Sequence, residues 1–175
     1  MKLALCVQRL RRNAQAFHSL LGGLEQDHAD TNIVRWVPAP GSWSLLLLVN
    51  HLADEERDDF KVRLDHVLHK PGVDWPAIDP EGWVESRDYA AQDYGPSLER
   101  FLAERQRSLE WLGTLDEPDW SLSHRHPALG LLSAGDLMAS WVAHDHLHMR
   151  QALGLMQGSL CEAVEPHTTA YAGDW

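Results

Sequence analysis

The chain has 175 residues, 44% of them hydrophobic, with eight tryptophans, which fits one folded domain and excludes a disordered chain. The formal net charge of −11 argues against a nucleic-acid partner, because phosphate binding depends on clustered lysine and arginine. It disfavours an anionic membrane surface for the same reason.

The two cysteines, Cys6 and Cys161, lie too far apart for a cysteine-based zinc spacing and suggest no disulfide framework, so we expect free thiols. The apolar run after Met1 is too short for the hydrophobic part of a signal peptide. The apolar run 45–49 is far too short to span a membrane. We therefore expect a cytoplasmic protein without a membrane partner.

Residues 3–24 predict the first helix, because apolar residues recur there every three or four positions. These residues are Leu3, Val7, Leu10, Ala14, Phe17, Leu21 and Leu24. We expect Gly22-Gly23 to weaken or end this helix.

A second helix is predicted over residues 43–69, with Ser42 or Ser44 as the capping residue, since a serine hydroxyl can accept from free N–H groups of the first turn. Its apolar stripe consists of Leu45, Val49, Leu52, Phe60, Leu64 and Val67. The charged residues between them are expected mainly to face solvent. They are Asp54, Glu56, Arg57, Asp59 and Lys61.

His51 departs from this division, because it lies beside the apolar stripe. It precedes Glu55 and Asp58 by one and two turns, so the three form a narrow polar line along the helix. This line could reach a metal shared with another helix. His51 could equally be an exposed residue paired with the carboxylates.

Residues 73–95 are rich in aromatic residues and lack periodicity, which predicts a long loop between the second and third helices. We expect this loop to cover one end of the bundle and line the mouth of a site, with simple aromatic packing as the alternative. A third helix is predicted from about Pro96 to Leu115. The next loop, 119–132, contains His124 and His126, which we expect to be solvated, and no segment reads as a convincing strand.

The fourth helix is predicted from about 134 to 158, because Ser133 and Asp136 have the spacing of a capping box. Its apolar positions run through Leu137 and Trp141 to Leu155, and His144 and His148 occupy two of them.

Residues four apart on a helix project from one face, so His144 and His148 could bind one metal ion. The alternative is a pair of core or cleft histidines that form hydrogen bonds with carboxylates or backbone. His146 points elsewhere, and we expect it to be structural or to support a ligand from outside the coordination sphere. Asp145 excludes the zincin motif, which requires glutamate after the first histidine.

Four long helices with polar residues at core positions predict an all-α four-helix bundle with long loops between helices two and three and between helices three and four. Three segments then resemble the DinB-like superfamily of bacterial four-helix-bundle proteins. They are Gly41-Ser42-Trp43-Ser44, Asn50-His51-Leu52-Ala53-Asp54-Glu55 and His144-Asp145-His146-Leu147-His148-Met149-Arg150-Gln151. The resemblance covers a domain of residues 1–157 and leaves 158–175 as an irregular tail packed on it.

This resemblance implies a metal triad of His51, His144 and His148, and often a homodimer. Several characterised members transfer a low-molecular-weight thiol or isomerise a substrate with thiol assistance. Three histidines leave an ion open to water or substrate, and they favour a divalent transition metal such as zinc, nickel or iron.

The leading hypothesis is a metal-dependent enzyme, of thiol S-transferase or hydrolase type, that activates a thiol or water against a small-molecule substrate. Glu55 could accept a hydrogen bond at the site or act as general base, and Gln151 could orient bound water. One alternative is a non-enzymatic metal- or small-ligand-binding stress protein. Another is a structural dimer with core histidines.

Overall fold

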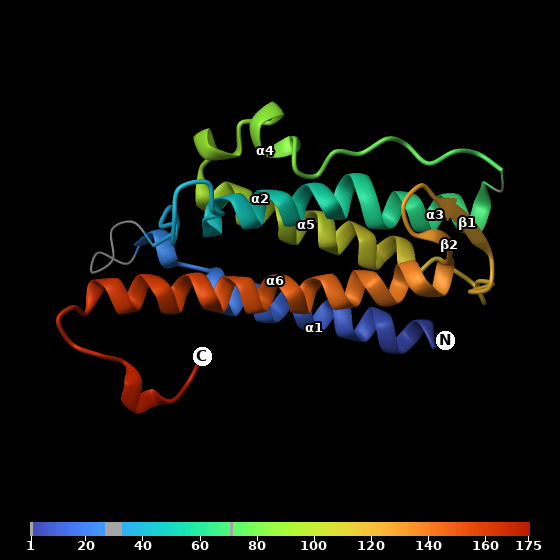
Figure 1. Cartoon of the computed structure of the whole chain (residues 1–175). Coiled ribbons are helices and arrows are strands. Elements are labelled where there is room, and N and C mark those ends of the chain that lie inside the picture. The colour runs from blue at the N-terminus through green and yellow to red at the C-terminus, as the bar shows by residue number, and fades with distance from the viewer. Residues whose placement is uncertain (1, 27–32, 71) are drawn as a thin grey trace.

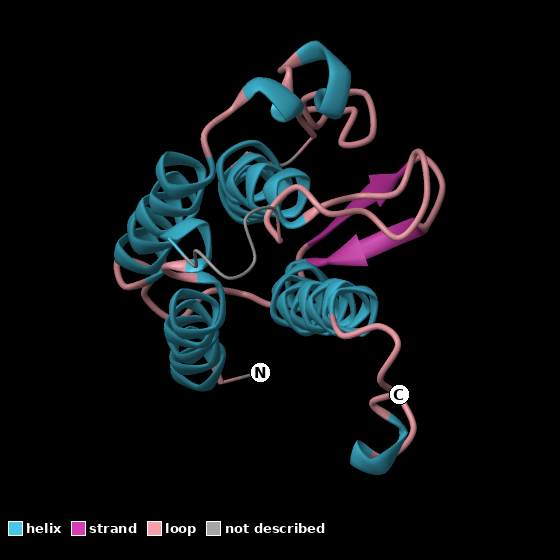
Figure 2. Ribbon diagram, turned by 90° about the vertical axis from the view of Figure 1, so that its left-hand side faces the viewer, coloured by secondary structure: helices cyan, strands magenta, loops and turns pink. Residues whose placement is uncertain are grey.

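A computed structural model describes residues 2–26, 33–70 and 72–175. Four long helical segments lie side by side in a bundle (Figure 1). They are α1 (Leu3–Leu21), α2 (Leu45–Glu55) continued through a π-helical turn (Glu56–Phe60) into α3 (Lys61–His69), α5 (Tyr94–Leu112), and α6 (Ala134–Ala163). Seen from the end in Figure 2, they surround a common core, which confirms the four-helix bundle.

The helix ends follow the predicted chemistry. Ser44 caps α2 by accepting from the backbone N–H of Leu47. Ser133 and Asp136 form both hydrogen bonds of a capping box at the start of α6. After α1, Gly23 adopts a φ of +79°, which a glycine reaches without strain, so the chain turns here as expected.

The expectation of no strand is wrong. Between α5 and α6, β1 (Ser123–His126) pairs antiparallel with β2 (Gly130–Ser133). The turn is closed by His126, whose Nδ1 accepts from the backbone N–H groups of Ala128 and Leu129. The strands are only four residues long and mostly polar or exposed, so they carry no alternating apolar pattern.

The connection 73–93 runs along the side of α2 and α3 in Figure 1, rather than over one end of the bundle as expected. It contains a short helix, α4 (Trp83–Ser86), and a 3₁₀ turn, Tyr89–Ala91. Tyr89 anchors it by donating from its hydroxyl to Asp54 at 2.6 Å, and Arg87 forms ion pairs with Asp54 and Asp58. These contacts fix its course beside α2.

The last helix extends to Ala163, beyond the expected end near 158. Gly158 lies against Trp36, so that a Cβ there would approach the ring to 2.6 Å, and Trp36 donates to Glu162 at 2.7 Å. This packing holds the extra turn in place. The remaining tail turns back below α6 in Figure 1.

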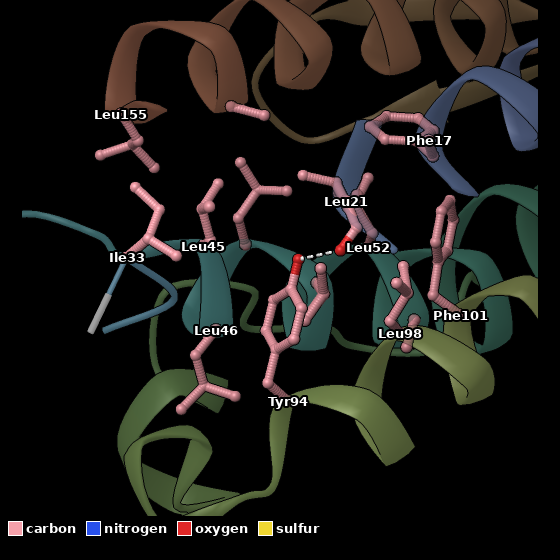
Figure 3. Close-up of a cluster of buried hydrophobic side chains, with 14 residues drawn as sticks. Phe17, Leu21, Ile33, Leu45, Leu46, Leu52, Tyr94, Leu98, Phe101 and Leu155 are labelled. Atoms are coloured by element: carbon pink, nitrogen blue, oxygen red, sulfur yellow. Dashed lines mark hydrogen bonds between the residues drawn. The ribbon is translucent and has the colours of Figure 1, made fainter. Parts of the chain in front are cut away.

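Two apolar clusters fill the bundle. One includes Phe17, Leu21, Leu45, Leu98 and Phe101, with the Tyr94 hydroxyl donating to the carbonyl of Leu21 (Figure 3). The other lies toward the opposite end. It includes Leu10, Leu64, Leu112, Met138 and Trp141. Between them on each long helix lie buried polar residues, so the bundle has a polar middle layer.

Both cysteines are free thiols, as expected. Among the described helices, none is long and apolar enough to cross a membrane.

Candidate metal centre

Three histidines from α2 and α6 meet in the middle of the bundle. One ring nitrogen from each of His51, His144 and His148 lies within 4.8 Å of the other two. The ring centroids are 5.4 Å apart for His51 and His144, 4.9 Å for His51 and His148, and 4.3 Å for His144 and His148. The structure therefore brings together the three residues that the sequence singled out.

Gln151 sets the tautomer of the His148 ring. Its Oε1 lies 2.8 Å from His148 Nδ1, and because a carbonyl oxygen only accepts, this nitrogen carries the proton. His148 Nε2 then holds a lone pair and lies 3.0 Å from His144 Nε2. Gln151 thus contacts a histidine of the cluster directly, and its role in orienting bound water stays a prediction.

Burial keeps these imidazoles neutral. Desolvation first, and then the neighbouring His148, lowers the pKa of His51 to about 3. The same two causes, in the same order, lower the pKa of His144 to about 2. The pKa of His148 is also lowered by burial. Neutral imidazole is the form that binds a metal ion.

The donor set fits a transition metal. Two nitrogen ligands at about 2.0–2.1 Å from a zinc ion stand roughly 2.9–3.4 Å apart, depending on the coordination angle. The two Nε2 atoms of α6 are 3.0 Å apart, and His51 Nδ1 is buried without a hydrogen-bond partner among the described residues. The carboxylate partners that core histidines would use are also missing for His144 and His148 within the described ranges.

Aromatic rings enclose the cluster. Trp43 lies edge-on to His51 at 4.8 Å and parallel to His148 at 6.4 Å, measured between centroids. Phe60 lies 5.0 Å from His144. Trp43 is placed by the turn that leads to the capping residue Ser44, and Phe60 by the π-helical turn, so both positions follow from local backbone structure.

One open pocket reaches the cluster. It has a volume of about 530 Å³. It is lined by Pro38, Gly41, Ser42, Trp43, His148, Gln151, Gly154 and Leu155. His148 and Gln151 therefore form its inner wall, where a ligand could approach a bound ion.

Glu55 is buried one helical turn after His51. Burial, and then the adjacent Asp59 carboxylate, raises the pKa of Glu55 to about 8, so it can hold or release a proton near neutral pH. The third residue of the predicted polar line, Asp58, instead forms ion pairs with Arg57 and Arg87. His146, expected to have a structural or supporting role, is exposed.

A second buried polar cluster was missed by the sequence analysis. We call it the Arg105 network, and it consists of Asn13, Glu56, Arg105, Trp141 and Asp145. Arg105 is 1% exposed and forms paired hydrogen bonds to Glu56 at 2.8 and 2.9 Å and to Asp145 at 2.8 and 2.7 Å.

The expectation that Asp54, Glu56 and Asp59 face solvent is therefore wrong, since all three are buried. The π-helical turn adds a residue to one turn of the helix and changes which side chains face inward. The available signal was Arg105 itself, four residues from both Phe101 and Leu109 on the apolar face of α5.

The fold and this centre define a four-helix bundle with a three-histidine site between its second and last long helices. Residues 9–152 match the family model of the DinB superfamily, and the chain belongs to that superfamily. None of the curated proteins matches it significantly in sequence.

A solved structure shows the same fold. The chain is similar to YfiT from Bacillus subtilis, with a TM-score of 0.71 and 20% sequence identity, over 89% of this chain and 86% of that one. YfiT is described as a probable metal-dependent hydrolase with an unusual four-helix bundle topology. At this identity the match establishes the fold of the bundle.

Proposed function

We propose that the protein is a metal-dependent enzyme in which His51, His144 and His148 bind a divalent transition ion and a small-molecule substrate is attacked by water or a thiol. The observation that carries this is the convergence of three neutral imidazoles within 4.8 Å beside an open pocket. The description of YfiT as a probable metal-dependent hydrolase supports hydrolysis as the first reaction to test.

A bound ion of this kind would lower the pKa of water or a thiol and polarise a carbonyl group. Gln151 holds the His148 ring in the tautomer that leaves Nε2 free as a ligand. Trp43 and Phe60 limit the access of bulk water to the three rings.

Glu55 is assigned the proton transfer. In hydrolysis of an ester, one proton of the attacking water passes to the Glu55 carboxylate while the water oxygen bonds to the carbonyl carbon. The bond from that carbon to the leaving oxygen breaks, and the leaving oxygen takes the proton from Glu55 through a water molecule, because Glu55 does not line the pocket. The products are a carboxylic acid and an alcohol, and Glu55 returns to its starting state. Its pKa near 8 suits both transfers.

The primary test is metal content. Protein purified without a histidine tag and without added nickel is analysed by mass spectrometry for bound zinc, nickel and iron. We expect one ion per chain, and loss of that ion in His51→Ala and His148→Ala. His146→Ala is the matched control, since this histidine is exposed on the same helix. Full metal content in both triad variants would overturn the assignment.

Turnover is tested separately, with 4-nitrophenyl esters for hydrolysis and a low-molecular-weight thiol with an electrophile for transfer. Turnover that disappears with His148→Ala and with Glu55→Gln supports an enzyme. Stoichiometric metal without turnover of either kind would instead favour the alternative of a non-enzymatic metal- or ligand-binding protein.

We also propose a homodimer. Leu153 and Leu160 of α6 are 41% and 51% exposed and line an apolar groove with Met156 and Trp175, a surface that a second copy could cover. Sedimentation equilibrium tests this, and a protein that stays monomeric at a concentration on the order of 100 µM would contradict it.

A further inference from the structure

The pocket beside the histidines is lined by apolar residues and a few polar residues, without an acidic residue, a lysine or an arginine. Its walls are Pro38, Trp43 and Leu155 together with the glycines, and its polar groups are Ser42, His148 and Gln151. No lysine, arginine, aspartate or glutamate is among these lining residues. The polar groups at its inner wall, His148 and Gln151, are the residues of the proposed metal centre.

This lining selects against charge. A carboxylate or phosphate that entered would lose water without a cationic side chain in the wall to replace it, which is costly. The net charge of −11 further disfavours anions near the protein. An ammonium group would find no carboxylate in the wall. An apolar group gains from contact with Trp43 and Leu155, and the volume of about 530 Å³ suits a small organic molecule.

We propose that this pocket is the substrate site and that it takes uncharged, largely apolar acyl compounds, namely esters and thioesters, with their acyl chain between Trp43, Pro38 and Leu155. The proposal rests on the proposed metal-dependent function for the reaction, but the pocket and its selectivity are properties of this chain's own residues. An adjoining pocket shares Gly41, Ser42 and Trp43 with this one and is otherwise lined by Leu47, Glu81, Gly82, Val84 and Glu85, so it contains none of the three histidines.

Gly154 offers a clean way to close the pocket. It lies on α6 next to Leu155 and about one turn after Gln151, and a Cβ built on it meets nothing within 4 Å. A large side chain at this position would therefore enter open space and not the core. Ala139, exposed on the same helix and outside the pocket lining, accepts the same side chain as a matched control.

The first experiment measures binding without metal. Metal-free protein is titrated with 4-phenylbutanamide and with 4-phenylbutanoate, followed by saturation-transfer NMR. We expect the neutral amide to bind at least tenfold more tightly than the carboxylate. Gly154→Phe should weaken amide binding at least tenfold, and Ala139→Phe should leave it unchanged. Equal binding of amide and carboxylate, or unchanged binding in Gly154→Phe, would overturn the proposal.

The variant must be shown to fold. Gly154→Phe and the smaller Gly154→Leu should keep the circular dichroism and zinc content of the parent protein. The new side chain would enter open space, and Gly154 is not one of the three histidines that would bind zinc. If Gly154→Phe is unfolded, Gly154→Leu decides, and it must weaken amide binding at least threefold.

The second experiment measures turnover by zinc-loaded protein. The substrates are 4-nitrophenyl butanoate and the singly charged mono-4-nitrophenyl glutarate, which share a leaving group. We expect kcat/KM to be at least tenfold higher for the neutral ester than for the charged one. Gly154→Phe should remove most of this difference by raising the KM of the neutral ester.

The two proposals fail in different ways. If neither ester is hydrolysed but the amide still binds in a Gly154-dependent manner, the hydrolytic function is wrong and the pocket assignment stands. If both esters are hydrolysed equally and Gly154→Phe has no effect, the pocket assignment is wrong and the metal-dependent function stands.

Discussion

The middle layer of the bundle contains two buried polar clusters, and they differ in how far their polar atoms find hydrogen-bond partners within the protein. In the Arg105 network, the guanidinium donates to both oxygens of Glu56 and both oxygens of Asp145. Trp141 adds a donor to Glu56 at 2.9 Å, and Asn13 adds one to Asp145 at 2.8 Å. We call this cluster closed, since all four carboxylate oxygens of Glu56 and Asp145 accept hydrogen bonds from its own members.

The three histidines form the open cluster. His144 and His148 have their Nε2 atoms 3.0 Å apart, and His51 Nδ1 has no partner within the described part of the chain. A buried polar group without a partner costs about 1–3 kcal/mol. The contrast indicates that polarity in a core is not itself a functional signal, whereas three converging imidazoles, one with a ring nitrogen that has no partner among the described residues, indicate a ligand from outside.

The largest effect is expected from opening the closed cluster. Arg105→Ala leaves Glu56 and Asp145 buried without their partner, and loss of one member of a buried ion pair costs about 3–5 kcal/mol. We expect the free energy of unfolding, measured by urea denaturation, to fall by about this amount. Arg107→Ala is the control, because Arg107 is exposed and its ion pair should contribute at most about 1 kcal/mol. Equal losses in the two variants would show that the network is not a matched cluster.

The next largest effect comes from filling the open cluster. A ligand that binds only the folded state at 100 times its Kd stabilises by about 2.7 kcal/mol. For a domain of this size that corresponds to a rise in Tm of about 5–10 °C. We expect zinc to produce this rise in the parent protein and in His146→Ala, and not in His144→Ala. A zinc-dependent rise in His144→Ala would break the comparison, since the open cluster would then not be the site.

A third effect depends on pH and concerns the border of the open cluster. Burial and the Asp59 carboxylate raise the pKa of Glu55 to about 8, from an ordinary value of 4.5. Below pH 4.5 the group is protonated in both the folded and the unfolded state. Between pH 4.5 and 8 only the unfolded state releases the proton, so its contribution to stability decreases as the pH rises, and above pH 8 the full penalty remains.

Glu55→Gln removes this penalty, because glutamine stays neutral and keeps a donor for Asp59. In metal-free protein we expect equal stability of the variant and the parent at pH 4. At pH 9 we expect the variant to be about 2 kcal/mol more stable, less than the pKa change alone implies, since local relaxation offsets part of the penalty. Thermal unfolding across this range measures the difference. A variant that is less stable at pH 9 would mean that the Glu55 carboxylate is paired in the folded state.

The sequence allowed the open cluster to be predicted better than the closed one. His144 and His148 occupy core positions on one helix, and a spacing of four residues is visible in any sequence. The predicted inward face of α6 is confirmed by the burial of Leu137, Trp141 and His148. Placing His51 beside them needed the family resemblance, because contacts between distant segments leave no periodic signal.

The closed cluster could not be predicted in the same way. Glu56 and Arg105 are 49 residues apart and pair only once the bundle has formed. Taken singly, each reads as a charged residue of an amphipathic helix, for which solvent is the usual partner. The π-helical turn adds to the difficulty, since a pattern with a period of 3.6 residues assumes a regular helix through Glu56–Phe60.

The smallest expected effect concerns the hydrogen bond that orients the His148 ring in the open cluster. Gln151→Leu removes the acceptor from His148 Nδ1, and the loss of such a partner typically weakens metal binding 10- to 100-fold. We expect the low end, about tenfold or 1.4 kcal/mol, because Trp43 still packs parallel to the His148 ring. Competition for zinc with a chelating dye measures this.

Gln157→Leu is the matched control, since this side chain lies on the same helix and donates to Cys161. Gln151→Glu should bind zinc at least as tightly as the parent protein, because a carboxylate accepts more strongly from the same nitrogen. In addition, ¹⁵N chemical shifts of metal-free protein should show His148 protonated on Nδ1 in the parent and a mixture of tautomers in Gln151→Leu. If the tautomer is the same in both, Gln151 only fills space beside the ring, and the histidines of the open cluster are oriented by packing alone.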